Sequence, residues 1–121
     1  MDMSFDAWLY FPQLTELAAF AKALPDLTII LNHIGGLLRT GPYANKDEEV
    51  LKTWKRGISQ VAECHNVVVK LGGITQPRTG YDWHSRKVPI GSEELSQVMA
   101  PLMDYCIENF GPERCMFESN F

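Results

Sequence analysis

The chain has 121 residues, a length that suits one domain and excludes two independent ones. Its residues are 45% hydrophobic and 21% charged, so enough apolar side chains are present to bury a core, which excludes an intrinsically disordered chain. The net charge of −4 argues against binding of nucleic acid through neutralised phosphates.

The first predicted elements are a strand, a helix and a second strand. A strand is predicted over residues 4–10, and Pro12 suits the first turn of the helix that follows. That helix is predicted over residues 13–24, where apolar residues recur at spacings of three and four. The apolar and β-branched run at residues 28–31 is typical of a parallel strand covered on both faces.

A second helix and a third strand come next. Asn45, with Glu48 three residues later, predicts a capping box and a helix that runs to about Cys64. Trp54 lies at helical spacing from other apolar residues and is expected in the core. The consecutive valines within residues 66–70 are typical of a short buried strand.

The last predicted elements are a third helix and a fourth strand, after a long polar loop. Ser92 predicts the N-cap of a helix that ends at residues 111–112. Pro101 is expected to bend or split this helix. Residues 115–117 predict the fourth strand, and no following helix covers its face or edge, so we expect a truncated chain.

This alternation of strands and helices predicts an α/β fold with a parallel sheet and right-handed crossovers. The three cysteines are too widely spaced for a disulfide framework or a zinc ribbon, so reduced thiols are expected. No apolar run approaches the roughly 20 residues that a membrane span needs. We therefore expect a cytoplasmic protein that contacts no membrane.

Functional side chains of parallel α/β folds gather where strands end. His33 directly follows a buried strand, where a histidine can act as a metal ligand or as a general acid or base. The alternative is a structural histidine bound to a loop carbonyl. His65 lies at the opposite end of the next strand and is expected to be a surface residue. The segments selected by this rule are 8–10, 32–36, 70–73 and 118–120, with Glu118 and Asn120 in the last.

The long loop at residues 76–91 contains Arg78 and His84 among aromatic and polar residues. Such a composition suits a lid or binding loop over a site, and the alternative is a solvated surface loop. Lys70, at a strand end, could bind an anionic group of a substrate or extend its ammonium into solvent.

Four segments together resemble the amidohydrolase-related family, and in particular its branch of metal-dependent hydrolases that includes sugar-acid lactonases and the pyrone-dicarboxylate lactonase. The segments are residues 4–14, 31–36, 67–73 and 113–121. The resemblance implies a (β/α)8 TIM barrel of roughly 200 to 250 residues or more. Residues 1–121 would then form a partial domain, the second half of the barrel with strands five to eight, truncated at both ends.

The resemblance also implies which residues form the site. His33 matches the strand-six histidine of the family, a candidate metal ligand, and His84 matches a loop histidine of close relatives. Phe11 stands where relatives often have the strand-five histidine, and Asn120 stands where many have the strand-eight aspartate. A divalent metal such as zinc is the implied cofactor, and these two departures argue against its binding by this chain. Some lactonases of the group are similar in working without a metal.

The implied activity is hydrolysis of a lactone or similar cyclic ester, or of a C–N bond, by attack of water on a carbonyl. His33 would polarise or protonate the substrate oxygen, and Asn120 would orient the water. The implied partner is a small carboxylate-bearing substrate. Substrate binding is assigned to Trp8, Tyr10, Lys70, Arg78 and His84.

Two other functions fit the sequence. The chain could be an inactive barrel fragment that is stable only as a homo-oligomer, because four parallel strands cannot close a barrel. It could also be a small anion-binding α/β module that uses the glycine pairs at residues 35–36 or 72–73.

Overall fold

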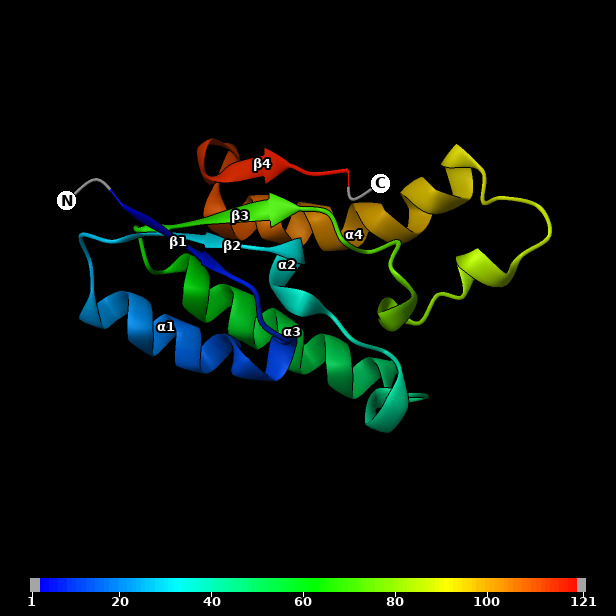
Figure 1. Ribbon diagram of the computed structural model, residues 1–121, viewed down its shortest axis with the longest axis horizontal. Coiled ribbons are helices and arrows are strands. Elements are labelled where there is room, and N and C mark those ends of the chain that lie inside the picture. Colours follow the sequence, from blue (N-terminus) through cyan, green and yellow to red (C-terminus); the bar gives the residue numbers. More distant parts are fainter. Residues whose placement is uncertain (1–2, 120–121) are drawn as a thin grey trace.

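Four parallel strands form one sheet, and their order in space follows their order in the chain (Figure 1). The computed structural model describes residues 3–119. Each strand pairs in parallel with the next, which confirms the predicted alternation of helices with a parallel sheet. The strands are β1 (Ser4–Ala7), β2 (Thr28–Leu31), β3 (Val67–Leu71) and β4 (Cys115–Phe117).

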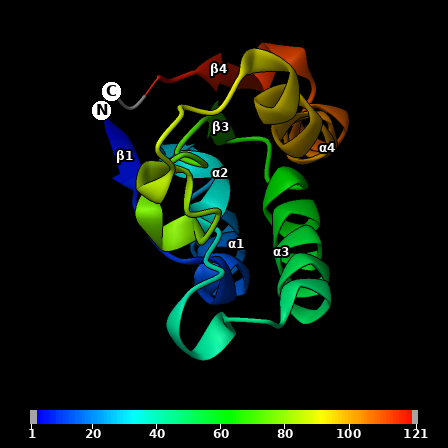
Figure 2. The ribbon, with the colours of Figure 1, turned by 90° about the vertical axis from the view of Figure 1, so that its right-hand side faces the viewer.

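Three long helices cover one side of this sheet: α1 (Leu14–Ala23), α3 (Asp47–Ala62) and α4 (Ser92–Phe110). They follow one another round the sheet, with α1 packed on α3 and α3 packed on α4 (Figure 2). A single turn, α2 (His33–Gly36), follows β2 directly. Within residues 3–119, no helix is long and apolar enough to cross a membrane.

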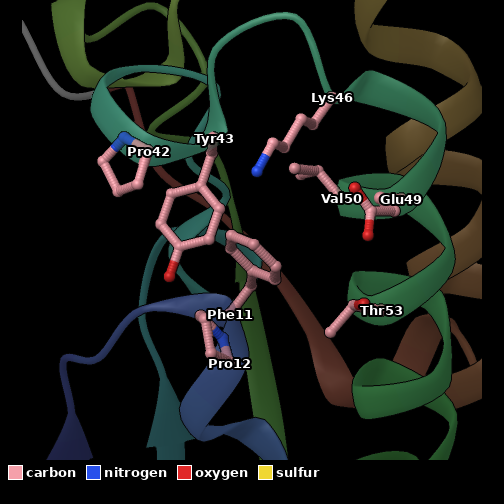
Figure 3. Close-up of a pocket in the computed structure, with 8 residues that line it drawn as sticks. All are labelled: Phe11, Pro12, Pro42, Tyr43, Lys46, Glu49, Val50 and Thr53. Atoms are coloured by element: carbon pink, nitrogen blue, oxygen red, sulfur yellow. The ribbon is translucent and has the colours of Figure 1, made fainter.

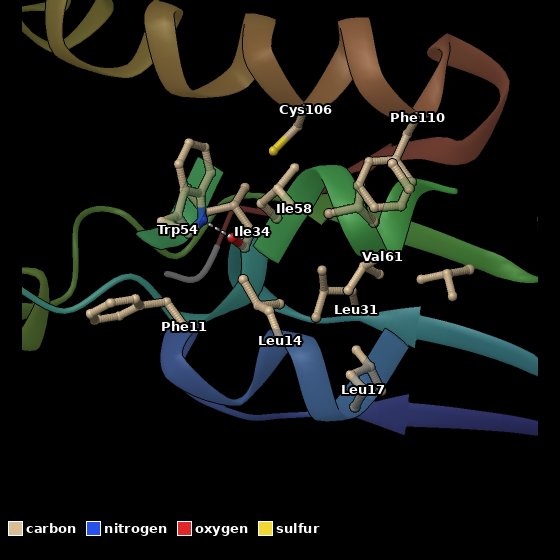
Figure 4. Close-up of a cluster of buried hydrophobic side chains, with 14 of the residues drawn as sticks. Phe11, Leu14, Leu17, Leu31, Ile34, Trp54, Ile58, Val61, Cys106 and Phe110 are labelled. Atoms are coloured by element: carbon tan, nitrogen blue, oxygen red, sulfur yellow. Dashed lines mark hydrogen bonds between the residues drawn. The ribbon is translucent and has the colours of Figure 1, made fainter. Parts of the chain in front are cut away.

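The core lies between the helices and the sheet (Figure 4). Alternate residues of a strand point to opposite faces, and Ile29 and Leu31 of β2 face the helices with no exposed surface. Trp54 of α3 is fully buried, as expected. Among residues 3–119, no helix covers the opposite face of the sheet, and on it Lys70 of β3 lies level with Met116 of β4. In the described part of the chain, no strand pairs with the outer edge of β1 or of β4, and Phe117 on β4 is 85% exposed.

The starts of α3 and α4 differ from the predictions. The helix α3 begins at Asp47, and Asn45 takes a left-handed conformation with φ 60°, so the predicted capping box is absent. Three acidic residues in the first turn of α3 take over part of the cap's role, because negative charge is favourable at a helix N-terminus. The helix α4 begins at Ser92 itself, with Gly91 as the N-cap.

Two further boundaries are corrected by the structure. The strand β1 ends at Ala7, so residues 8–10 belong to the loop that follows it. The helix α4 continues through Pro101 and is not split. Pro101 is exposed, while Leu102, Cys106 and Phe110 are buried, so the missing hydrogen bond falls on the solvent side of the helix.

Arg114 joins three elements at the end of the sheet where the strands begin. Its guanidinium donates hydrogen bonds to four backbone carbonyls at distances of 2.9–3.1 Å. These carbonyls belong to Ala62, Cys64, Val67 and Phe110, at the ends of α3 and α4 and the start of β3. Two helix C-termini therefore share one positive charge, which their dipoles favour.

We expect Arg114→Ala to lower the free energy of unfolding by about 2–3 kcal/mol, because a charged donor is lost and partly buried carbonyls are left unpaired. Urea denaturation followed by circular dichroism measures the loss. Arg56→Ala removes an exposed arginine of α3 and is the matched control. Equal midpoints for the two variants would contradict this role of Arg114.

Candidate functional site

The carboxyl ends of the four strands meet at one end of the sheet, which faces the viewer in Figure 2. The loops that leave β1, β2 and β3 and residues 118–119 after β4 all lie there. Sequence reasoning selected this end because loops of parallel strands converge on it.

A short polar contact between two titratable side chains at this end joins His33 to Glu118. The Nδ1 atom of His33 lies 2.6 Å from Oε1 of Glu118, and the backbone N–H of His33 donates to the same oxygen at 3.1 Å. Both side chains are largely buried, with 19% and 15% of their surface exposed. A carboxylate paired with a histidine is a common arrangement in acid–base catalysis. The sequence places both residues at this end but gives no signal of their pairing, because 85 positions separate them.

His33 begins a turn in which four consecutive residues have positive φ angles. The φ angles are 53° at His33, 47° at Ile34, 82° at Gly35 and 66° at Gly36. A left-handed conformation costs a residue with a side chain about 1–2 kcal/mol, so surrounding contacts must hold it. Trp54 supplies one of them: its indole Nε1–H donates to the carbonyl of Ile34 at 2.7 Å in the buried core (Figure 4).

Close packing within the protein accounts for the glycines at this end of the sheet, so no bound ligand is needed to explain them. A Cβ on Gly36 would lie 1.9 Å from the carbonyl oxygen of Leu9. A Cβ on Gly73 would lie 2.6 Å from Cβ of His33. The N–H of Gly35 donates to the carbonyl of Asn32 at 3.0 Å, so it is already used within the turn.

Arg78, Trp8 and Tyr10 lie together beside this turn. Arg78 and His33 line the same small hollow of about 10 Å³. The Arg78 guanidinium carbon lies 5.3 Å from the centre of the Trp8 ring, and the Trp8 and Tyr10 rings are 5.4 Å apart. Trp8 is 54% exposed. The structure thus groups three of the predicted substrate-binding residues near His33.

The remaining predicted site residues make no described contact with His33. Lys70 is half-buried on the helix-free face of the sheet, and no contact among the described residues joins it to His33. His84 lies on an exposed turn (Trp83–Ser85) of the long loop, and residues 3–119 show no contact between it and His33. Asn120 lies outside the described residues.

The base of the long loop is fixed to the segment before α3. The hydroxyl of Thr79 lies within hydrogen-bond distance of the carbonyls of Ile74 and Gln76, and that of Thr40 donates to the carbonyl of Arg78 at 3.0 Å. Arg78 therefore projects from an anchored backbone.

An aromatic stack anchors the next part of the loop. The Arg39 guanidinium carbon lies 4.1 Å from the centre of the Tyr81 ring, which stacks on Trp83 at 4.8 Å. Arg39 also forms two hydrogen bonds with Asp47, which raise the pKa of Arg39 and lower that of Asp47. Burial raises the pKa of Tyr81. Sequence reasoning missed this network, since no local pattern pairs residue 39 with residue 81.

Phe11, at the position that the resemblance gives to a histidine, is a packing residue. It is 3% exposed and meets the ring of Tyr43 edge-on, with 5.0 Å between ring centres. Together with Lys46 and Glu49 these rings border an open hollow of about 350 Å³ between the starts of α1 and α3 (Figure 3). This hollow shares no lining residue with the hollow at His33.

A metal ion does not fit the donors of residues 3–119. Within this part of the chain, no three His, Cys, Asp or Glu side chains are grouped closely enough to hold one. Phe11 offers only hydrocarbon, and Glu118 occupies Nδ1 of His33, so Nε2 is the one ring atom of His33 left to bind a metal. No step of a reaction is therefore assigned to a metal held by these residues.

The cysteines are free thiols that are poor nucleophiles. Burial raises the pKa of Cys106 to about 12 and also raises those of Cys64 and Cys115. Because the thiolate is the reactive form, chemistry at these residues is disfavoured near neutral pH. His33 and Glu118 remain the best candidates for proton transfer.

A family model described as Amidohydrolase matches residues 2–121. Among curated proteins, an uncharacterized protein y4mH of Sinorhizobium fredii is 29% identical over 98% of the chain. An L-fucono-1,5-lactonase of Burkholderia multivorans is 25% identical over 99% of the chain. The chain spans 33% and 38% of the lengths of these two relatives.

A solved amidohydrolase structure is also similar to this chain over part of its own length. The crystal structure of an amidohydrolase from Burkholderia multivorans with bound zinc superimposes with a TM-score of 0.77 and 26% identity. The match covers 99% of this chain and 38% of that protein.

Proposed function

We propose that this chain, which belongs to the amidohydrolase family, forms part of a hydrolase that opens a carboxylate-bearing lactone or a similar cyclic ester. The observation that carries the proposal is the His33–Glu118 pair at the carboxyl ends of the strands, with Arg78 beside it. The similarity to an L-fucono-1,5-lactonase supports a lactone as the substrate class.

His33 acts as the general acid and base in this proposal. Its Nε2 takes a proton from the water whose oxygen attacks the ring carbonyl of the lactone. The ring C–O bond then breaks, and the same proton passes to the leaving oxygen, so the product is a hydroxy acid. The Glu118 carboxylate stabilises the positive imidazolium between these two transfers. Asn120, two positions beyond Glu118, is proposed to orient the water through its amide.

The surrounding side chains account for binding. Arg78 pairs with a substrate carboxylate, since its planar guanidinium suits a two-pronged contact. Trp8 and Tyr10 form an apolar wall beside it. Lys70 adds positive charge on the helix-free face of the sheet, and His84 is carried by the same loop as Arg78.

The test measures hydrolysis of two lactones by the full-length protein. One of the pair carries carboxylates, as a pyrone dicarboxylate does, and the other is uncharged, as L-fucono-1,5-lactone is. We expect hydrolysis above the spontaneous rate, and Arg78→Gln should raise KM about 10-fold, or 1.4 kcal/mol, for the charged lactone alone. A pH indicator follows the acid released.

No hydrolysis of either lactone would contradict the proposal. The open edges of β1 and β4 would then favour the second candidate, an inactive fragment that pairs these edges with another copy. In that case light scattering should show a mass that rises with concentration.

A further inference from the structure

Glu118 reaches His33 across an intervening strand. The two residues follow β4 and β2, and β3 lies between these strands in the sheet. The backbone N–H of Glu118 donates to the carbonyl of Leu71 at 3.3 Å, which fixes the end of β4 against β3. The Glu118 side chain therefore starts from a fixed backbone position.

Gly73, just after β3, leaves the room that this contact needs. Its φ is 79°, and a Cβ there would lie 2.6 Å from Cβ and 2.9 Å from Nδ1 of His33. Real Cβ atoms do not come this close to another heavy atom, so any other residue at position 73 would displace the imidazole. The glycine thus allows the ring to lie against the end of β3 while Nδ1 faces Glu118.

The contact between Nδ1 and Oε1 determines where a neutral imidazole carries its proton. An ionised carboxylate only accepts hydrogen bonds, so Nδ1 donates to Oε1, as the backbone N–H of His33 also does. In a neutral imidazole one nitrogen carries the proton and the other is an acceptor. With the proton on Nδ1, the lone pair is on Nε2, the atom that must take a proton from water.

We propose that Glu118 is a positioning residue, which holds His33 in the Nδ1–H tautomer and in its left-handed turn. The tautomer follows from the bond to Nδ1, and the turn is held by the bond from the backbone N–H. The proposal rests on the function proposed above, because it assigns the state in which His33 enters that reaction.

The test is nitrogen-15 NMR of the histidine rings, which reports the tautomer directly and does not require activity. His33 is assigned by the loss of its signals in His33→Asn, and the exposed His65 and His84 serve as references. We expect wild-type His33 to carry its proton on Nδ1. In Glu118→Leu, which leaves Nδ1 without this acceptor, the signals should shift towards Nε2–H.

Kinetics separate this proposal from the lactonase assignment. Glu118→Leu should lower kcat about 100-fold or more, with KM changed about twofold or less. Glu108→Leu, at an exposed carboxylate of α4, is the control and should leave both unchanged. Thermal unfolding checks that each variant folds.

The proposal is overturned if wild-type His33 carries its proton on Nε2, a result that needs no folded variant. It is also overturned if the folded Glu118→Leu variant keeps the wild-type tautomer. A fixed Nδ1–H tautomer in a protein that hydrolyses no lactone would instead overturn the lactonase assignment and leave the geometry of the pair intact.

Discussion

Replacing His33 by asparagine is expected to lower kcat for lactone hydrolysis by about 10²- to 10⁴-fold, the usual contribution of a general acid or base. Asparagine adopts left-handed backbone conformations more readily than most residues. It also keeps the backbone N–H that donates to Glu118. The turn should therefore persist, while the group that moves a proton between water and the leaving oxygen is lost.

The control for this variant is His65→Asn. His65 is exposed between α3 and β3, at the end of the sheet away from His33, and should tolerate the change with kcat unaltered. Initial rates over a range of lactone concentrations separate kcat from KM, and circular dichroism confirms the fold. A His33→Asn enzyme with kcat within about twofold of the wild type would remove His33 from the chemistry.

The regular elements were predictable because local sequence determines them. The valines of β3 and the spacing of apolar residues in α1 carry the periods of a strand and a helix, and the structure has both elements there. The end of the sheet that holds His33 followed from the same reasoning. Helix starts were less predictable. Asparagine is a residue type that often caps helices, but Asn45 has a left-handed backbone and is not the N-cap of α3.

The details of the site depend on contacts between distant residues. Glu118 is identified as the partner of His33 only when β2, β3 and β4 are placed side by side. The glycine pair at residues 35–36 suggests a loop open to a ligand, but in the fold it provides a left-handed turn packed against Leu9 and Leu14. A single sequence carries the residue types but not these packing partners.

Gly36→Ala is expected to lower the free energy of unfolding by about 3–5 kcal/mol. Part of the loss, about 1–2 kcal/mol, comes from a Cβ at φ 66°. The larger part comes from the 1.9 Å approach of that Cβ to the carbonyl oxygen of Leu9. This atom belongs to the backbone, so no side-chain rotation relieves the overlap, and overpacking of this kind costs about 1–3 kcal/mol or more.

Gly41→Ala separates these two causes within the same chain. Gly41 has φ 59°, close to that of Gly36, but a Cβ there would meet no atom within 4 Å. Gly41→Ala should therefore lower the free energy of unfolding only by the cost of the left-handed backbone, about 1–2 kcal/mol. Urea titrations of both variants measure the difference. Equal losses would show that the loop after β1 moves away at no cost. A larger loss for Gly36→Ala would show that this loop, which carries Trp8 and Tyr10, is held rigidly against the turn that presents His33.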